Sequence, residues 1–193
     1  MFAPPPVEST VLGVDPGLTR CGYAILRVRH NTEIKLIGLG VLTTSKTKPM
    51  PERLAEVAEE FDSLFDQYSP DVLAIERVFF RANVRTAMSV GQVSGLVLSG
   101  AARRGIEIVQ YSPNQVKLAV VGWGGADKAQ VQKMVKQRLG LGTVPKPADA
   151  ADAAAIALCH VASSPLAVRI AVATHDPKKR GTRNLSRTGG ATA

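Results

Sequence analysis

Three short β-rich runs, followed by alternating helical and β-rich segments, constrain the fold of this chain more than any other feature. The first three runs are joined by short turns, which favours an antiparallel meander. They lie at residues 10–15, 21–29 and 34–43, and two further runs lie at 71–76 and 106–110. Consecutive strands followed by α/β alternation predict an α/β fold: a mixed sheet with helices on both faces.

Five segments have helical character. They are residues 51–68, 84–104, 113–120, 128–139 and 149–163. The second carries small residues at Gly91, Gly95 and Ser99, spaced four apart, so that another element can approach its backbone closely. That element is either the sheet, as ordinary packing, or a second subunit.

The length of 193 residues and a hydrophobic content of 45% suit one globular domain with a core of its own. We place the domain at residues 10–163, after a short extension at 1–9. Residues 164–193 form a basic tail with few large apolar side chains, and this composition predicts disorder. No apolar run approaches the roughly 20 residues of a membrane span, no secretory signal is evident, and two cysteines make no disulfide framework. We therefore expect a cytoplasmic protein with no membrane partner.

The charge is unevenly distributed along the chain. The net charge is +8, yet residues 1–76 carry −4 and residues 77–148 carry +9. So basic a middle third predicts a polyanionic partner, nucleic acid first, although a basic solvated face without a partner is the alternative.

Four carboxylates occupy informative positions: Asp15, Glu76, Asp149 and Asp152. Asp15 ends the first predicted strand and Glu76 ends the fourth. If those strands are parallel neighbours, both side chains emerge at the same end of the sheet. This is the end, beyond the carboxyl ends of the strands, where α/β proteins bind ligands. Asp149 and Asp152 are three residues apart at a helix start and share one face of its first turn, although helix capping is an alternative role for Asp149.

Carboxylates brought together in this way repel one another unless cations neutralise them. Oxygen ligands suit Mg²⁺ or Mn²⁺, and the sequence offers no competing His/Cys set. Two such ions can activate a water and stabilise the leaving oxygen in phosphodiester cleavage. The basic segment would then hold the substrate backbone.

Several motifs, in order along residues 10–163, resemble the RuvC family of bacterial Holliday-junction resolvases. They are GVDPGLT (13–19), GY (22–23), AIERVF (74–79), QVK (115–117), VVG (120–122), ADKAQVQ (126–132) and PADAADA (147–153). Each motif alone is weak, because a strand followed by DPG also opens actin-like ATPases, but together they are highly specific.

The resemblance implies a ribonuclease-H-like fold and a homodimer that nicks two opposed strands of a four-way DNA junction in recombination and repair. Asp15, Glu76, Asp149 and Asp152 match the family's catalytic and metal-binding positions, which implies a crossover junction endodeoxyribonuclease with two Mg²⁺ per site and Mn²⁺ as a substitute. The resemblance also implies work with the RuvA–RuvB branch-migration complex.

DNA contacts are implied at five further positions: Phe79, Arg77, Arg81, Lys117 and Lys128. Phe79 matches an aromatic residue that stacks on a base at the junction, and the two lysines match basic residues near the scissile backbone. Aromatic pairs such as Phe79–Phe80 are usually core, but the flanking arginines favour an exposed wedge.

Other interpretations stay open from the sequence. Trp123, in a glycine-rich loop, either stacks on DNA or covers an edge of the core. A junction-binding protein without catalysis is one alternative function. An actin-like phosphotransferase is another, although the chain is short for the two lobes of that fold.

Overall fold

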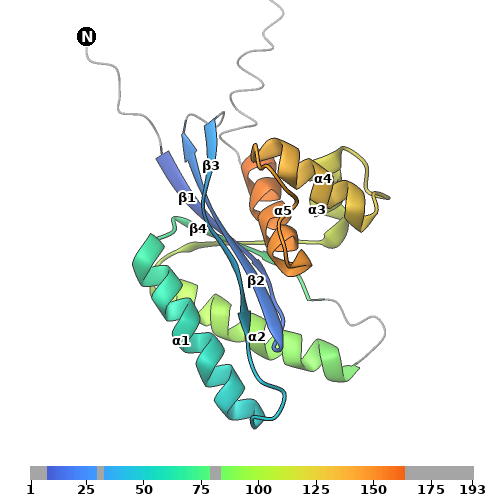
Figure 1. The fold of residues 1–193 in the computed structure, drawn as a ribbon. Coiled ribbons are helices and arrows are strands. Elements are labelled where there is room, and N and C mark those ends of the chain that lie inside the picture. Colours follow the sequence, from blue (N-terminus) through green and yellow to red (C-terminus); the bar gives the residue numbers. More distant parts are fainter. Residues whose placement is uncertain (1–7, 30–32, 79–83, 164–193) are drawn as a thin grey trace, which may run out of the picture.

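The structure, a computed structural model, describes residues 8–29, 33–78 and 84–163. Five strands form one mixed sheet in the order β3-β2-β1-β4-β5 (Figure 1). The strands are β1 (Glu8–Asp15), β2 (Arg20–Arg29), β3 (Glu33–Thr43), β4 (Val72–Glu76) and β5 (Glu107–Tyr111). The helices are α1 (Met50–Tyr68), α2 (Val84–Arg103), α3 (Pro113–Val121), α4 (Lys128–Arg138) and α5 (Ala148–Ser163). The predicted α/β fold is confirmed.

The sheet combines the expected meander with parallel pairing. β1, β2 and β3 pair antiparallel, whereas β4 runs parallel to both β1 and β5. Between β2 and β3 the register shifts after the pair Ile25–Gly38, because Leu26 pairs with Leu36. The pairing is therefore irregular beside Gly38.

Helices cover both faces of the sheet (Figure 1). Alternate residues of the strands point to opposite faces, so each face has its own core. α1 and α2 cover one face, where Leu12 and Ile75 pack against Phe61 and Val97. The other face packs against α3, α4 and α5. None of the helices in the described ranges is long and apolar enough to span a membrane.

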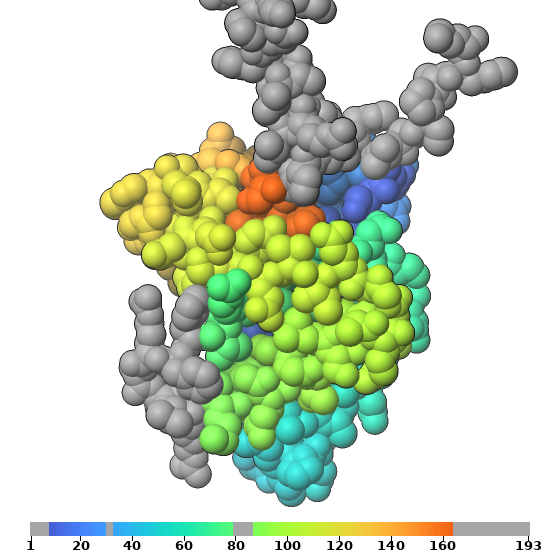
Figure 2. Space-filling model, turned by 180° about the vertical axis from the view of Figure 1, so that it is seen from behind, coloured from blue at the N-terminus to red at the C-terminus, as the bar shows by residue number. Residues whose placement is uncertain are grey.

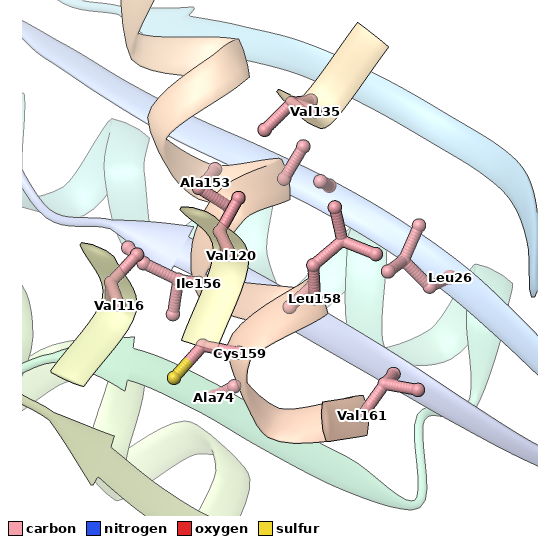
Figure 3. Close-up of a cluster of buried hydrophobic side chains, with 14 of the residues drawn as sticks. Leu26, Ala74, Val116, Val120, Val135, Ala153, Ile156, Leu158, Cys159 and Val161 are labelled. Carbon is pink, nitrogen blue, oxygen red and sulfur yellow. The ribbon is translucent and has the colours of Figure 1, made fainter. Parts of the chain in front are cut away.

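α5 lies directly on the sheet, and Figure 3 shows its side chains between those of α3, α4 and the strands. The helix is rich in alanine and almost entirely buried. Its close approach depends on Gly13, because a side chain there would overlap the carbonyl oxygen of Ala153 and the side chain of Ala157. Cys159 is buried, and burial raises the pKa of its thiol to about 11.

The small residues of α2 do not pack on the sheet, so that interpretation was wrong. A Cβ atom added at Gly91 or Gly95 would meet nothing within 4 Å. Val93, Val97 and Ala101 are the α2 residues that face the core. α2 lies at the surface in Figure 2, in yellow-green, and Gly91 and Gly95 are not covered by another element.

Most element boundaries differ from the prediction by one or two residues. β1 begins at Glu8 and β5 extends to Tyr111, because each continues pairing with its neighbour. The predicted tail at 164–193 and most of the extension at 1–9 lie outside the described residues.

Candidate active site

β1 and β4 bring Asp15 and Glu76 together. The two strands are parallel neighbours, with Val14 opposite Ile75, and each carboxylate is the next residue. Val14 and Ile75 are fully buried, which anchors both strand ends in the core. The two carboxylates therefore emerge side by side at the carboxyl ends of two neighbouring strands, as predicted from the sequence.

The first turn of α5 places the other two carboxylates at the same end of the sheet. Asp149 and Asp152 are partly buried, and both lie close enough to Asp15 to influence its ionisation. The position of the helix depends on Gly22, directly opposite Asp15 in the sheet. A side chain at Gly22 would overlap the backbone carbonyl of Asp149.

The ionisation of Asp15 reflects this crowding. The pKa of its carboxyl is raised to about 7, first by burial and then by the charges of Glu76, Asp152 and Asp149 in that order, against a lowering by Lys128. Burial also raises the pKa of Glu76, with Asp152 adding to the effect. A negative charge on Asp15 is thus disfavoured in the folded protein, so a cation beside it would stabilise the ionised carboxylate.

Two basic side chains neutralise the carboxylates of α5. Arg20 contacts Asp149, with both its Nε and a terminal nitrogen 2.8 Å from Oδ2. The Nζ of Lys128 donates to Oδ2 of Asp152 at 2.6 Å, and this bond raises the pKa of Lys128. Each α5 carboxylate therefore has a cationic partner within the protein.

The residues fit a divalent metal by their chemistry. Four carboxylates supply the oxygen ligands that Mg²⁺ prefers, and the charges of the other three add to burial in raising the pKa of Asp15. Within the described ranges, no three Asp, Glu, His or Cys side chains are arranged as a formed metal site. The side chains of Asp149 and Asp152 are instead oriented by their ion pairs with Arg20 and Lys128.

Two capping boxes position the basic residues of α3 and α4. Ser112 and Gln115 cap α3, and Asp127 and Gln130 cap α4, each pair exchanging side-chain and backbone hydrogen bonds. Such caps define the first turn of a helix. Lys128, the first residue of α4, is thereby directed at Asp152.

A cavity of about 190 Å³ adjoins the carboxylates. Glu76, Asp152, Lys117 and Lys128 line it, together with apolar residues of α3, α4 and α5. The structure thus brings Lys117 to the same site as the acidic residues. A polyanion that enters this cavity would therefore meet two lysines beside the carboxylates.

The other predicted DNA contacts are placed differently. Arg77 is exposed immediately after β4, and its backbone N–H donates to the carbonyl of Tyr111 at 2.8 Å. Phe79 and Arg81 lie outside the described residues and stay predictions. Trp123 is 62% exposed, so the interpretation that it covers the core was wrong.

Two residues of the site were missed from the sequence. Arg20 could have been suspected from its position just after the Pro16–Gly17 turn that follows Asp15. Gly22 could have been suspected because it lies at the start of the next strand of the predicted hairpin, opposite Asp15. Neither position identifies its partner, because Asp149 is more than 120 residues away in the chain.

Comparison with known proteins identifies the family. Residues 11–160 match the family model described as crossover junction endodeoxyribonuclease RuvC. The chain belongs to the RuvC family. Among RuvC relatives, that of Leifsonia xyli subsp. xyli is 50% identical over 150 residues, covering 78% of this chain and 72% of the relative. That of Saccharopolyspora erythraea is 49% identical over 163 residues, covering 84% and 82%.

A solved structure of a RuvC protein agrees with this assignment. Thermus thermophilus RuvC in complex with a Holliday junction substrate matches with a TM-score of 0.76 and 34% identity, covering 84% of this chain and 96% of that one. The yeast mitochondrial resolvase Ydc2 matches with a TM-score of 0.56 at 16% identity, covering 80% and 79%, which supports the fold alone. The ribonuclease-H-like fold expected of the RuvC family is thus confirmed.

Proposed function

We propose that this chain resolves four-way DNA junctions by metal-dependent hydrolysis of phosphodiester bonds, as part of recombination and repair. The observation that carries the proposal is the alignment of Asp15 with Glu76 at adjacent strand ends, in a chain of the RuvC family. The solved complex of the Thermus thermophilus relative with a Holliday junction supports the substrate. The combination of catalytic carboxylates with this fold favours an enzyme over a junction-binding protein.

Asp15, Glu76, Asp149 and Asp152 would hold the metal, which we propose to be two Mg²⁺ ions, with Mn²⁺ as a substitute. When bound, the ions supply an activated water and neutralise the leaving oxygen. Asp15 must be ionised to serve as a ligand, and its pKa of about 7 places that ionisation near neutral pH. In the reaction the water gives up a proton as its oxygen bonds to phosphorus, the bond between phosphorus and the leaving oxygen breaks, and the leaving oxygen takes up a proton.

Lys117 and Lys128 would bind the backbone beside the scissile phosphate, because both line the cavity next to Glu76. Lys128 donates to Asp152 in the structure and would donate to a phosphate oxygen when the DNA is bound. Arg77, Arg81 and Phe79 would extend the interface after β4, with Phe79 stacked on a base as the family resemblance implies.

Two assemblies belong to the proposal. A homodimer would place two sites on opposed strands, and the uncovered glycines of α2, with Met88 60% exposed beside them, offer a surface for close contact between subunits. The RuvA–RuvB complex would be the partner in branch migration. We place this work in the cytoplasm.

Incubation with a synthetic mobile four-way junction tests the function. The wild-type protein should cut two opposed strands when Mg²⁺ is present and none when EDTA is present. Asp15→Asn and Glu76→Gln should abolish cleavage and still bind the junction, because each removes a ligand and also makes the surface less negative. Asp71→Asn is the matched control for charge, since Asp71 lies at the opposite end of β4.

Junction binding without cleavage by the wild-type protein, in either metal, would replace this proposal with a non-catalytic role. Cleavage by Asp15→Asn at the wild-type rate would remove the site assignment.

A further inference from the structure

A second cavity lies beside the turn that follows β1. Its volume is about 490 Å³, and it is bounded by that turn, by the loop and first turn leading into α1, and by α2. We call it the basic groove. Its lining residues are Gly17, Leu18, Thr19, Arg20, Lys46, Met50, Arg53, Ser89 and Val90.

The charge of the basic groove is of one sign. Arg20, Lys46 and Arg53 line it, and none of its lining residues carries a carboxylate. Within the part of the chain that the structure describes, Lys46 and Arg53 form no ion pair, whereas Arg20 pairs with Asp149. Two cations of the groove are thus left without a counter-charge from the described protein.

Arg53 is held in place by neutral groups. Its Nε donates to the hydroxyl of Thr44 and a terminal nitrogen donates to the hydroxyl of Thr19, both at 2.9 Å. The Thr44 hydroxyl in turn donates to the carbonyl of Leu18, and Thr44 itself is buried. The guanidinium is therefore oriented without being neutralised, and its planar fork retains further N–H groups for a ligand.

The position of the basic groove links it to the acidic site. Gly17 lines the groove and lies two residues after Asp15, and Arg20 lines the groove while contacting Asp149 of the acidic site. A DNA strand that runs from the carboxylates past Arg20 would thus enter the basic groove. Oriented guanidinium and ammonium groups are the usual partners of phosphate oxygens.

We infer that the basic groove binds phosphates of the DNA strand that flanks the scissile phosphate, on the side opposite Lys117. Arg53 contacts one phosphate through its fork, Lys46 supplies a second charge, and Arg20 stands between groove and metal site. This inference rests on the proposed function and extends it, because it gives the substrate strand a path across both cavities.

Salt dependence of binding tests the inference. Binding of the full-length protein to a fluorescent four-way junction is measured by anisotropy in EDTA over a range of KCl concentrations. Lys46→Ala and Arg53→Gln should each lower the slope of log K against log salt by about 0.9, the value for one phosphate contact in duplex DNA. Lys35→Ala is the control: Lys35 is exposed on β3 and not part of the groove, so it should leave the slope unchanged.

The variants separate a binding role from a folding role. Lys46 is exposed in a loop, so its replacement should leave the melting temperature unchanged even if Arg53→Gln lowers it. A wild-type slope in both Lys46→Ala and Arg53→Gln would overturn the inference while leaving junction cleavage by the wild-type protein intact. Failure of the wild-type protein to bind or cut junctions would instead overturn the proposed function, and the inference with it.

Discussion

Gly22 on β2 lies against the backbone carbonyl of Asp149, so closely that any side chain at Gly22 would overlap the carbonyl oxygen. Because Gly22 is also the partner of Asp15 in the sheet, one residue sets the distance between the strand end and the first turn of α5. The arrangement of the acidic site therefore depends on a residue that carries no functional group.

Gly22→Ala should displace the first turn of α5 and lower junction cleavage. Overpacking of this kind costs about 1–3 kcal/mol of folding stability, so most of the protein should still be folded when activity is lost. Gly142→Ala is the matched control, since a Cβ there meets nothing within 4 Å. Equal cleavage rates for the two variants, measured beside their melting temperatures, would show that the contact does not position the site.

The stability of the metal-free protein should fall as pH rises. Asp15 has a pKa of about 7 in the folded chain and an ordinary value of 3.8, so the unfolded chain loses this proton first. Between about pH 4 and pH 7 this group lowers the free energy of unfolding by up to about 1.4 kcal/mol per pH unit, with no further change above pH 7.

Asp15→Asn should therefore melt at a higher temperature than the wild type at pH 8 in EDTA, and the difference should shrink toward pH 4. Saturating Mg²⁺ should stabilise the wild type at pH 8 more than it stabilises the variant. Parallel melting curves across the whole pH range would contradict the predicted ionisation of Asp15.

Lys128 should control the pH dependence of cleavage. Its charge lowers the pKa of both Asp15 and Glu76, so Lys128→Ala should raise those values and shift the rising limb of the pH–rate profile to higher pH. Lys128→Arg keeps the charge and should keep most of the profile. Lys133→Ala, an exposed lysine of the same helix, serves as control. A uniform loss of rate in Lys128→Ala at every pH would indicate DNA contact alone.

The uncovered glycines of α2 test the proposed homodimer. In a monomer, Gly95→Ala should stabilise the helix by about 0.5–1 kcal/mol, because the added methyl meets no atom. At a subunit contact, Gly95→Glu should weaken self-association, measured by sedimentation over a range of concentrations. Ala55→Glu, on the exposed face of α1, should leave association unchanged. Identical sedimentation of both variants and the wild type would exclude this face from a dimer.

Trp123 offers a direct optical test of DNA contact. It is the single tryptophan of the chain and is 62% exposed, so its emission reports on this loop alone. Stacking on a base should quench the emission when junction DNA is added, and Trp123→Ala should weaken binding by roughly 1–3 kcal/mol. Leu118→Ala removes a similarly exposed apolar side chain without an aromatic face. Unchanged emission on saturation with DNA would contradict stacking.

Much of the fold follows from local sequence chemistry. The Pro16–Gly17 turn and the Ser69–Pro70 stop mark where neighbouring elements end, and the strand-end positions of Asp15 and Glu76 follow from those boundaries. The direction of the α2 glycines did not follow, because small residues at fourfold spacing suit either a covered or an open helix face. Only the positions of Val93 and Val97 in the core decide between them.

The sequence by itself determined the element order, the carboxylates at two strand ends and the excess of basic charge, since each depends on residues close together in the chain. The tertiary structure alone decided that Arg20 meets Asp149, that Lys128 meets Asp152, and that Arg53 faces a cavity beside the β1 turn. These contacts join residues of different elements. The contacts of Arg20 and Lys128 depend on how closely α5 packs on the glycines of the sheet. The residue pattern along the chain does not contain the distance between elements that are far apart in sequence.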